Sequence, residues 1–179
     1  MPSQASKVSK QIKKKKPGKL GALHENSRDA KRLRRANARD DRVNRLATIR
    51  ARQSEPSIER VQFFRDAADE RQATFTFEET QALIEVFLKR DSEQLSELKE
   101  KRRPGRPSST AQDLLQAKHD LENKEYNSGF WIPDMEDGDN ILMLQAWDGQ
   151  WSSMSTMNYV RITRSGSKQT SQFPPNREN

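Results

Sequence analysis

The 179-residue sequence contains no cysteine. Disulfides, thiolate metal sites and thiol nucleophiles are therefore excluded together, and the composition fits a reducing compartment. No apolar run approaches the roughly 20 residues that a membrane span needs. The charged N-terminus is not followed by an apolar segment, which argues against a secretory signal. We therefore expect a soluble intracellular protein without a membrane partner.

Apolar residues are scarce as well. They make up 31% of the chain, whereas charged residues make up 33%, and the mean hydropathy is −1.11. A single core that includes the whole chain cannot be built from this composition. The tryptophans and phenylalanines all lie beyond residue 60. We therefore expect the packed part of the protein in its C-terminal two-thirds.

Positive charge, by contrast, is abundant at one end. The first 52 residues hold 17 of the 33 Lys and Arg but only four acids, a net charge of +13, and the remaining 127 residues sum to −6. A basic arm joined to a mildly acidic body is typical of a polyanion-binding protein. Each Lys or Arg placed against a phosphate releases a condensed counterion, which favours binding.

The residue pattern predicts a mainly α protein with minor β. The segments that we expect are a disordered basic tail over residues 1–26, a long basic helix over 27–54, a helical bundle over 55–128 with a basic loop at 101–108, an aromatic-rich C-terminal element over 129–164, and a disordered polar tail over 165–179. The tails have compositions that cannot repay the entropy of ordering.

Local signals set the expected helix boundaries. Pro56 suits the first turn of a new helix, and Thr76 followed by Glu79 has the spacing of a capping box. We expect Asp91 to cap a short helix and Ser109 or Thr110 to begin the next one. Residues 159–163, rich in β-branched side chains, indicate a small strand or hairpin.

Two groups of basic residues are candidate nucleic-acid contacts. They are Lys13, Lys14, Lys15, Lys16, Arg32, Arg34, Arg35, Arg39, Arg42 and Arg45 in the arm, and Lys101, Arg102, Arg103 and Arg106 in the loop. Arginine at this density suits forked phosphate contacts, although a charge run can equally be a solvated surface. The loop also resembles an AT-hook, but Pro104 stands where that motif has its first core arginine.

Other candidate sites are weaker. Trp131 and Trp151 are candidates for protein contacts, although tryptophans in a domain with so few large apolar residues more often belong to the core, and we expect at least one to be partly exposed. The acidic stretch at residues 134–139 lacks the spacing of an EF-hand, so helix capping explains it better than metal binding. No nucleophile–base pair, phosphate loop or dinucleotide motif is present, so we expect no catalytic residues, no metal and no cofactor.

Three stretches occur in the order KEKRRPGRPSSTAQDLL, GFWIPDM and LQAWDGQWSSMSTMNYVRIT. Together they resemble the translation machinery-associated protein 16 family of eukaryotes, over residues from about Arg28 to Arg164. Trp131 departs from this pattern, because some relatives are expected to have an aliphatic residue there. The matched positions are Arg102, Arg103, Arg106, Pro107, Gly129, Pro133, Asp134, Trp147 and Gly149.

The resemblance implies a non-enzymatic factor in biogenesis of the large ribosomal subunit, which associates with nuclear pre-60S particles. The implied partners are pre-ribosomal RNA, large-subunit ribosomal proteins and assembly factors, and the implied location is the nucleus and nucleolus. We expect a monomer with no small-molecule substrate. The alternative class is a chromatin- or DNA-binding nuclear protein that uses the basic arm and the AT-hook-like loop.

Overall fold

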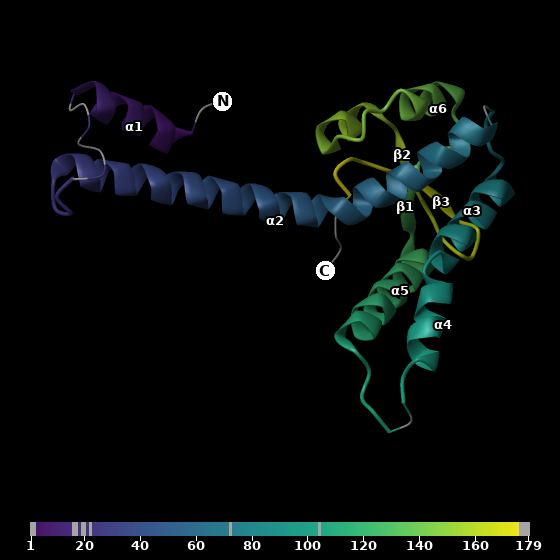
Figure 1. Cartoon of the computed structure of the whole chain (residues 1–179). Coiled ribbons are helices and arrows are strands. Elements are labelled where there is room, and N and C mark those ends of the chain that lie inside the picture. Colours follow the sequence, from purple (N-terminus) through teal and green to yellow (C-terminus); the bar gives the residue numbers. More distant parts are fainter. Residues whose placement is uncertain are drawn as a thin grey trace. The chain divides into compact units, whose positions relative to one another are not determined.

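The computed structural model describes residues 3–15, 18, 21, 23–71, 73–103 and 105–175. The chain divides into two compact units, Met1–Glu55 and Pro56–Asn179 (Figure 1). Most of the described residues are helical, and the described strands form one small antiparallel sheet. The predicted mainly α class with minor β is therefore confirmed. None of the described helices combines the length and apolar character that crossing a membrane requires.

The first unit is a pair of packed helices. Helix α1, Gln4–Lys15, lies against the first part of helix α2, Arg28–Arg71, and buries Val8 and Ile12 beside Ala36. The carboxylate of Asp40 accepts hydrogen bonds from the backbone N–H groups of Gln4 and Ala5 at 3.2 and 2.8 Å.

The prediction of a disordered tail over residues 1–26 is therefore wrong over α1. Val8 and Ile12 are four residues apart, which places both on one helix face. Asp40 satisfies two of the N-terminal amides that an isolated helix leaves without partners. Ordering therefore depends on contacts between segments far apart in sequence, which composition does not reveal.

The predicted helix break at Pro56 is also wrong, because Pro56 lies inside α2. Proline in a helix interior costs roughly 3 kcal/mol through a lost hydrogen bond and a steric clash. Beyond it, α2 buries Val61, Phe64 and Ala68 completely. Burial of these side chains compensates for the cost, and the two segments predicted as separate helices form one.

The second unit continues with three helices: α3, Phe77–Lys89; α4, Ser92–Glu100; and α5, Thr110–Ser128. The predicted capping box of Thr76 and Glu79 is confirmed, and the Ser109 side chain caps α5 by accepting a hydrogen bond from the Gln112 amide. Asp91 precedes α4 as predicted but its side chain makes no capping bond. Its carboxylate instead pairs with Lys118 at 3.3 Å.

The sheet contains β1, Phe130–Pro133; β2, Tyr159–Ile162; and β3, Lys168–Ser171, in the order β1-β2-β3 with antiparallel neighbours. Helix α6, Gly138–Gln145, and the short 3-10 helix η1, Trp151–Thr156, connect β1 to β2. The prediction of a disordered tail over residues 165–179 is wrong over β3. Pairing with β2 and packing of Phe173 on the core order this segment.

One core serves the whole second unit. It gathers buried side chains from α2, α3, α5, the sheet, α6 and η1, which include Phe64, Phe87, Tyr126, Phe130, Trp131, Ile132, Leu144, Met154 and Tyr159. Because the aromatic residues lie beyond residue 60, the sequence places this core correctly in the C-terminal part of the chain.

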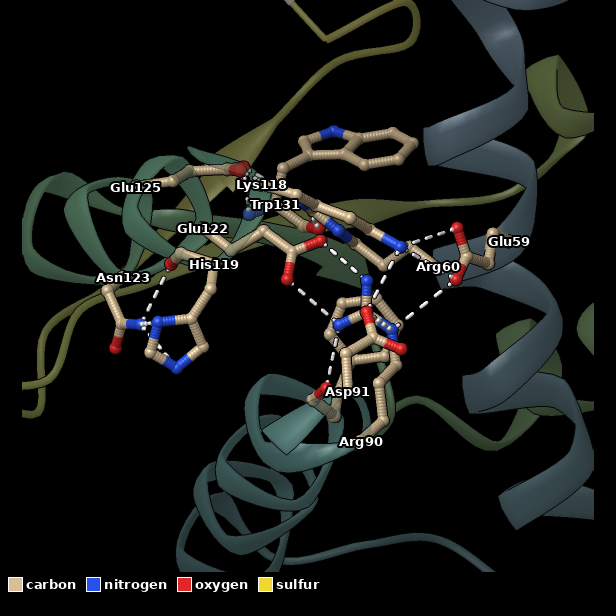
Figure 2. A network of polar contacts seen from close by, with 11 residues as sticks. Glu59, Arg60, Arg90, Asp91, Lys118, His119, Glu122, Asn123, Glu125 and Trp131 are labelled. Atoms are coloured by element: carbon tan, nitrogen blue, oxygen red, sulfur yellow. Dashed lines mark hydrogen bonds and ion pairs between the residues drawn. The ribbon is translucent and has the colours of Figure 1, made fainter. Parts of the chain in front are cut away.

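A largely buried ion pair joins α2, α5 and β1, with the Arg60 side chain 11% exposed and the Glu125 side chain 30% exposed. The Arg60 guanidinium donates to both carboxylate oxygens of Glu125 at 2.7 and 2.8 Å and to the backbone carbonyl of Trp131 at 3.1 Å (Figure 2). The Trp131 amide in turn donates to Glu125 at 3.2 Å. Arg60 also stacks over the Phe130 ring at 3.9 Å.

A second ion cluster lies beside the first. Arg90 donates to both carboxylate oxygens of Glu122 at 2.9 and 2.7 Å, and Lys118 pairs with Glu59 and Asp91 (Figure 2). Burial lowers the pKa of Arg90, but the hydrogen bonds and charge of Glu122 outweigh it and raise the pKa overall. This cluster links α2, the α3–α4 junction and α5.

We expect Arg60→Met to lower the free energy of unfolding by about 2 kcal/mol, because the Glu125 carboxylate, which is only 30% exposed, would lose its charged hydrogen-bond partner. Lys101→Met is the matched control: Lys101 forms an exposed pair with Glu97, and such pairs contribute about 0.5 kcal/mol or less. Urea denaturation followed by tryptophan fluorescence measures both. Equal losses would show that the Arg60 pair has no special role.

Docking of α1 should depend on pH. Hydrogen bonds from the Ala5 amide and the α1 N-terminus hold the pKa of Asp40 below its usual value of 3.8. The contact is therefore fully stabilising above that value and is lost as the pH falls through the lowered pKa. Carbon-13 Cα shifts of Val8 and Ile12 in the full-length protein should follow this titration. Asp40→Asn should abolish the dependence, whereas the neighbouring Asp41→Asn should preserve it.

Candidate nucleic-acid interface

The predicted basic loop lies at the turn between α4 and α5, which Figure 1 shows side by side. Lys101 forms an ion pair with Glu97, with 2.8 Å between Nζ and Oε2. Arg102, Arg103 and Arg106 are exposed, and within the described part of the chain none of them pairs with an acid side chain. Because α5 has 19 residues, a rise of about 1.5 Å per residue places this loop roughly 28 Å from the sheet.

The loop residues share a concave surface. The residues that line it are Leu98, Lys101, Arg102, Arg103, Arg106, Pro107, Ser108, Ser109 and Gln112. Three arginines and two serines therefore line one hollow. Guanidinium groups bind phosphate with two parallel hydrogen bonds, so such a hollow suits a phosphate group. Pro104, the position that departs from the AT-hook motif, lies outside the described residues.

The arginines of α2 form a continuous stripe in the first unit. They follow one another at intervals of four and three residues, which places them on one helix face. The members of this arginine stripe are Arg28, Arg32, Arg35, Arg39 and Arg42, all exposed. At about 1.5 Å per residue the stripe extends roughly 21 Å along the helix.

Helix α1 widens this basic surface. Its Gln11 accepts a hydrogen bond from Arg32 at 2.7 Å, so this flank of α1 borders the arginine stripe. Lys7 and Lys14 lie four residues before and three residues after Gln11, on the same flank. Lys13 and Lys15 lie exposed in the last turn of α1, and Lys16 lies outside the described residues.

The structure separates two of the predicted arginines from this stripe. At about 100° per residue, Arg34 and Arg45 lie roughly 100 to 120° around α2 from the middle of the stripe. Arg34 bonds to the backbone carbonyl of Glu25 and pairs with its carboxylate at 3.9 Å. Sequence reasoning missed Arg28 and Lys7. The signal that could have identified Arg28 is the four- and three-residue spacing that it shares with the stripe.

The two aromatic candidates differ in exposure. Trp131 is 1% exposed and stacks on Tyr159 with ring centroids 4.2 Å apart, so its prediction as a protein contact is wrong. The indole is buried because β1 runs through the core on both of its faces. Trp151 is partly exposed and packs against Phe173 at 4.7 Å, in agreement with the expectation that one of the two would be accessible.

The acidic stretch is structural. Asp137 caps α6 by accepting a hydrogen bond from the Asp139 amide, which confirms the capping interpretation. Asp134 and Glu136 both pair with Lys168 of β3, at 3.0 and 2.7 Å. Partial burial lowers the pKa of Lys168, but these hydrogen bonds outweigh it and raise the pKa overall. Among the described residues there is no group of three or more His, Asp or Glu arranged to hold a metal ion.

The fold and its surfaces define a small, mainly helical protein with arginine-rich surfaces outside an aromatic core. The chain belongs to the translation machinery-associated protein 16 family, whose sequence profile matches residues 19–164.

Curated relatives with that name agree with the match. The protein from Saccharomyces cerevisiae is 34% identical over 165 residues, which cover 90% of this chain and 92% of the relative. The homologue from Dictyostelium discoideum is 29% identical and covers 79% and 82% of the two chains. The Xenopus laevis protein is 27% identical and covers 93% and 84%.

The arginine stripe can be tested with two pairs of substitutions that remove equal charge from the same helix. Arg35→Ala with Arg42→Ala removes two members of the stripe. Arg45→Ala with Arg52→Ala removes two arginines at the same spacing from a flank of the helix, roughly 110° around its axis from the middle of the stripe. We expect the first pair to reduce the slope of log affinity against log salt for a double-helical RNA by about 1.5. The second pair should change it much less. Equal changes would mean that only total charge matters.

Proposed function

We propose that this protein is a non-catalytic ribosome biogenesis factor that associates with the nuclear pre-60S subunit. It binds ribosomal RNA through phosphate contacts of the arginine stripe and the α4–α5 loop, and it contacts large-subunit ribosomal proteins or assembly factors through its second unit. The relatives' name, which states an association with the translation machinery, supports this proposal.

The observation that carries the proposal is the group of exposed loop arginines without acid partners. In the same unit, by contrast, Arg60 and Arg90 form ion pairs with glutamates. Arg102, Arg103 and Arg106 have no such partner among the described residues. Three guanidinium groups without acid partners in one short loop repel each other. Binding of a polyanion removes this repulsion and is therefore favoured at the loop.

Two basic surfaces on one chain strengthen binding beyond either alone. Once the loop is bound, the arginine stripe meets its own phosphates at a high effective concentration. Phosphate contacts of this kind position a protein on RNA without reading its sequence. We therefore expect affinity to fall steeply with salt and to depend on RNA structure more than on base identity.

The second unit offers a surface of a different kind. Residues beyond 52 carry a net charge of −6, and α6 exposes Leu142 and Met143, whose side chains are 64% and 47% accessible. Trp151 adds a partly exposed aromatic ring. Apolar side chains in acidic surroundings suit basic protein partners, and ribosomal proteins are such partners.

The first experiment is ultraviolet crosslinking of the tagged protein in living cells, followed by sequencing of the attached RNA. A sharp cluster of crosslinks on large-subunit precursor RNA supports the proposal and identifies the binding site. Crosslinks spread over messenger RNA, or a preference for A·T-rich DNA in competition at fixed salt, would contradict it. The nucleus and nucleolus are the locations in which we expect the tagged protein.

Reversing the loop charge should weaken binding without unfolding the protein. We expect Arg102→Glu, Arg103→Glu and Arg106→Glu together to release the protein from large-subunit precursors in gradient sedimentation. The charge-matched control changes three exposed basic residues elsewhere in the second unit, Lys89, Lys124 and Arg164, to Glu. Thermal unfolding of both variants checks the fold. Unchanged sedimentation of the loop variant would contradict a role for the loop.

A further inference from the structure

The hollow at the α4–α5 loop brings phosphate-binding groups and a phosphate acceptor together. Arg102, Arg103 and Arg106 line it, and so do the hydroxyl-bearing Ser108 and Ser109. Ser109 is exposed, whereas Ser108 is partly buried. Ser109 therefore shares the lining of one hollow with three arginines that have no acid partner in the described structure. Its Oγ accepts a hydrogen bond from the Gln112 amide at 3.2 Å, so a phosphate attached there would lie at the N-terminus of α5, beside the arginine cluster.

The sequence around Ser109 has the charge pattern of a kinase substrate. Arg106 precedes Ser109 by three residues, and Arg103 and Arg102 precede it by six and seven. Many serine kinases select substrates by basic residues on the N-terminal side of the acceptor, because acidic groups line their substrate groove. The acceptor also lies in an exposed loop, where an enzyme can reach it.

We propose that Ser109 is a phosphorylation site, and that its phosphate occupies the arginine hollow and blocks the loop from RNA. A protein kinase supplies the phosphoryl group from ATP. The Ser109 Oγ–P bond forms, the bond between the γ-phosphorus and the bridging oxygen of ADP breaks, and the hydroxyl proton passes to the base of the kinase. The effect on RNA rests on the proposed function of the loop, whereas the phosphate-binding role of the hollow does not.

Charge and geometry both support this inhibition. A phosphoserine carries about −1.5 to −2 charges at pH 7 and three acceptor oxygens, so it neutralises about half to two-thirds of the charge of the three arginines. It also competes for their hydrogen-bonding groups within the same molecule, where its effective concentration is high. At its position before α5, the added negative charge is compatible with the helix dipole.

Phosphorylation itself is tested on the full-length protein with an arginine-directed serine kinase and ATP. We expect mass spectrometry to find the phosphate on Ser109. Ser109→Asn should abolish it, and this change retains a side chain that can cap α5. Ser108→Ala is the control and should remain a substrate. Phosphate on other residues with Ser109 unmodified would overturn the site assignment.

Occupation of the hollow has a readout that needs no RNA. Phosphorus-31 NMR of full-length protein with phosphoserine installed at position 109 follows the second ionisation of the phosphate, which normally has a pKa of about 6. Nearby guanidinium groups favour the dianion, so we expect a lower value. Changing Arg102, Arg103 and Arg106 to Ala should restore about 6. A normal value in the unsubstituted protein would overturn the inference.

RNA binding then tests the regulation. The probe is one RNA hairpin at fixed salt, and we expect phosphoserine at position 109 to weaken its binding roughly tenfold, which corresponds to two or three lost phosphate contacts. The effect should be much smaller in the triple alanine variant. Equal affinity of the two forms would overturn regulation. If neither form binds the hairpin while the phosphorus titration is shifted, the proposed function fails and the phosphate site stands.

Discussion

The ion pair between Arg60 and Glu125 is the interaction on which the second unit depends. Strand β1 pairs with β2 on one side only, which would leave the amide and carbonyl of Trp131 without partners inside the core. Glu125 accepts from that amide and Arg60 donates to that carbonyl, while the two side chains bind each other. Two side chains thus replace a neighbouring strand. This arrangement explains how a charged pair can lie largely out of solvent: both backbone hydrogen-bonding groups that the edge of β1 presents at Trp131 are used.

The protein uses arginine in two opposite ways, and local surroundings decide which. Arg60 and Arg90 lie over phenylalanine rings and bind carboxylates with both branches of the guanidinium group. Their charge is therefore neutralised within the fold. The loop arginines and the α2 stripe lie outside the core, on a short turn and on a helix face with few apolar side chains. This division explains how a chain with a third of its residues charged still builds a compact aromatic core.

Local signals in the sequence predicted much of the fold. The capping box at Thr76, the cap of Ser109 and the aromatic core beyond residue 60 all depend on neighbouring residues or on composition, and the structure confirms them. The failures depend on distant contacts: α1 needs Asp40, β3 needs β2, and helical continuity through Pro56 needs the burial of Phe64. For the candidate site, composition identified the basic residues, but only helical geometry sorted Arg35 from Arg34. Composition favoured burial of the tryptophans, but it could not decide which of Trp131 and Trp151 would be the exposed one, because that depends on tertiary packing.

The outer edges of the two outer strands, β1 and β3, are protected in different ways. At β1 the Arg60–Glu125 pair occupies the backbone groups of Trp131 that another strand would use. At β3 the sequence Lys-Gln-Thr-Ser is polar throughout, and Lys168 forms ion pairs with Asp134 and Glu136. Exposed apolar edges recruit strands from other chains and lead to aggregation, and polar or covered edges prevent this. A newly synthesised copy of this protein, surrounded by other partly folded chains, therefore presents no apolar strand edge at β1 or β3 on which aggregation could begin.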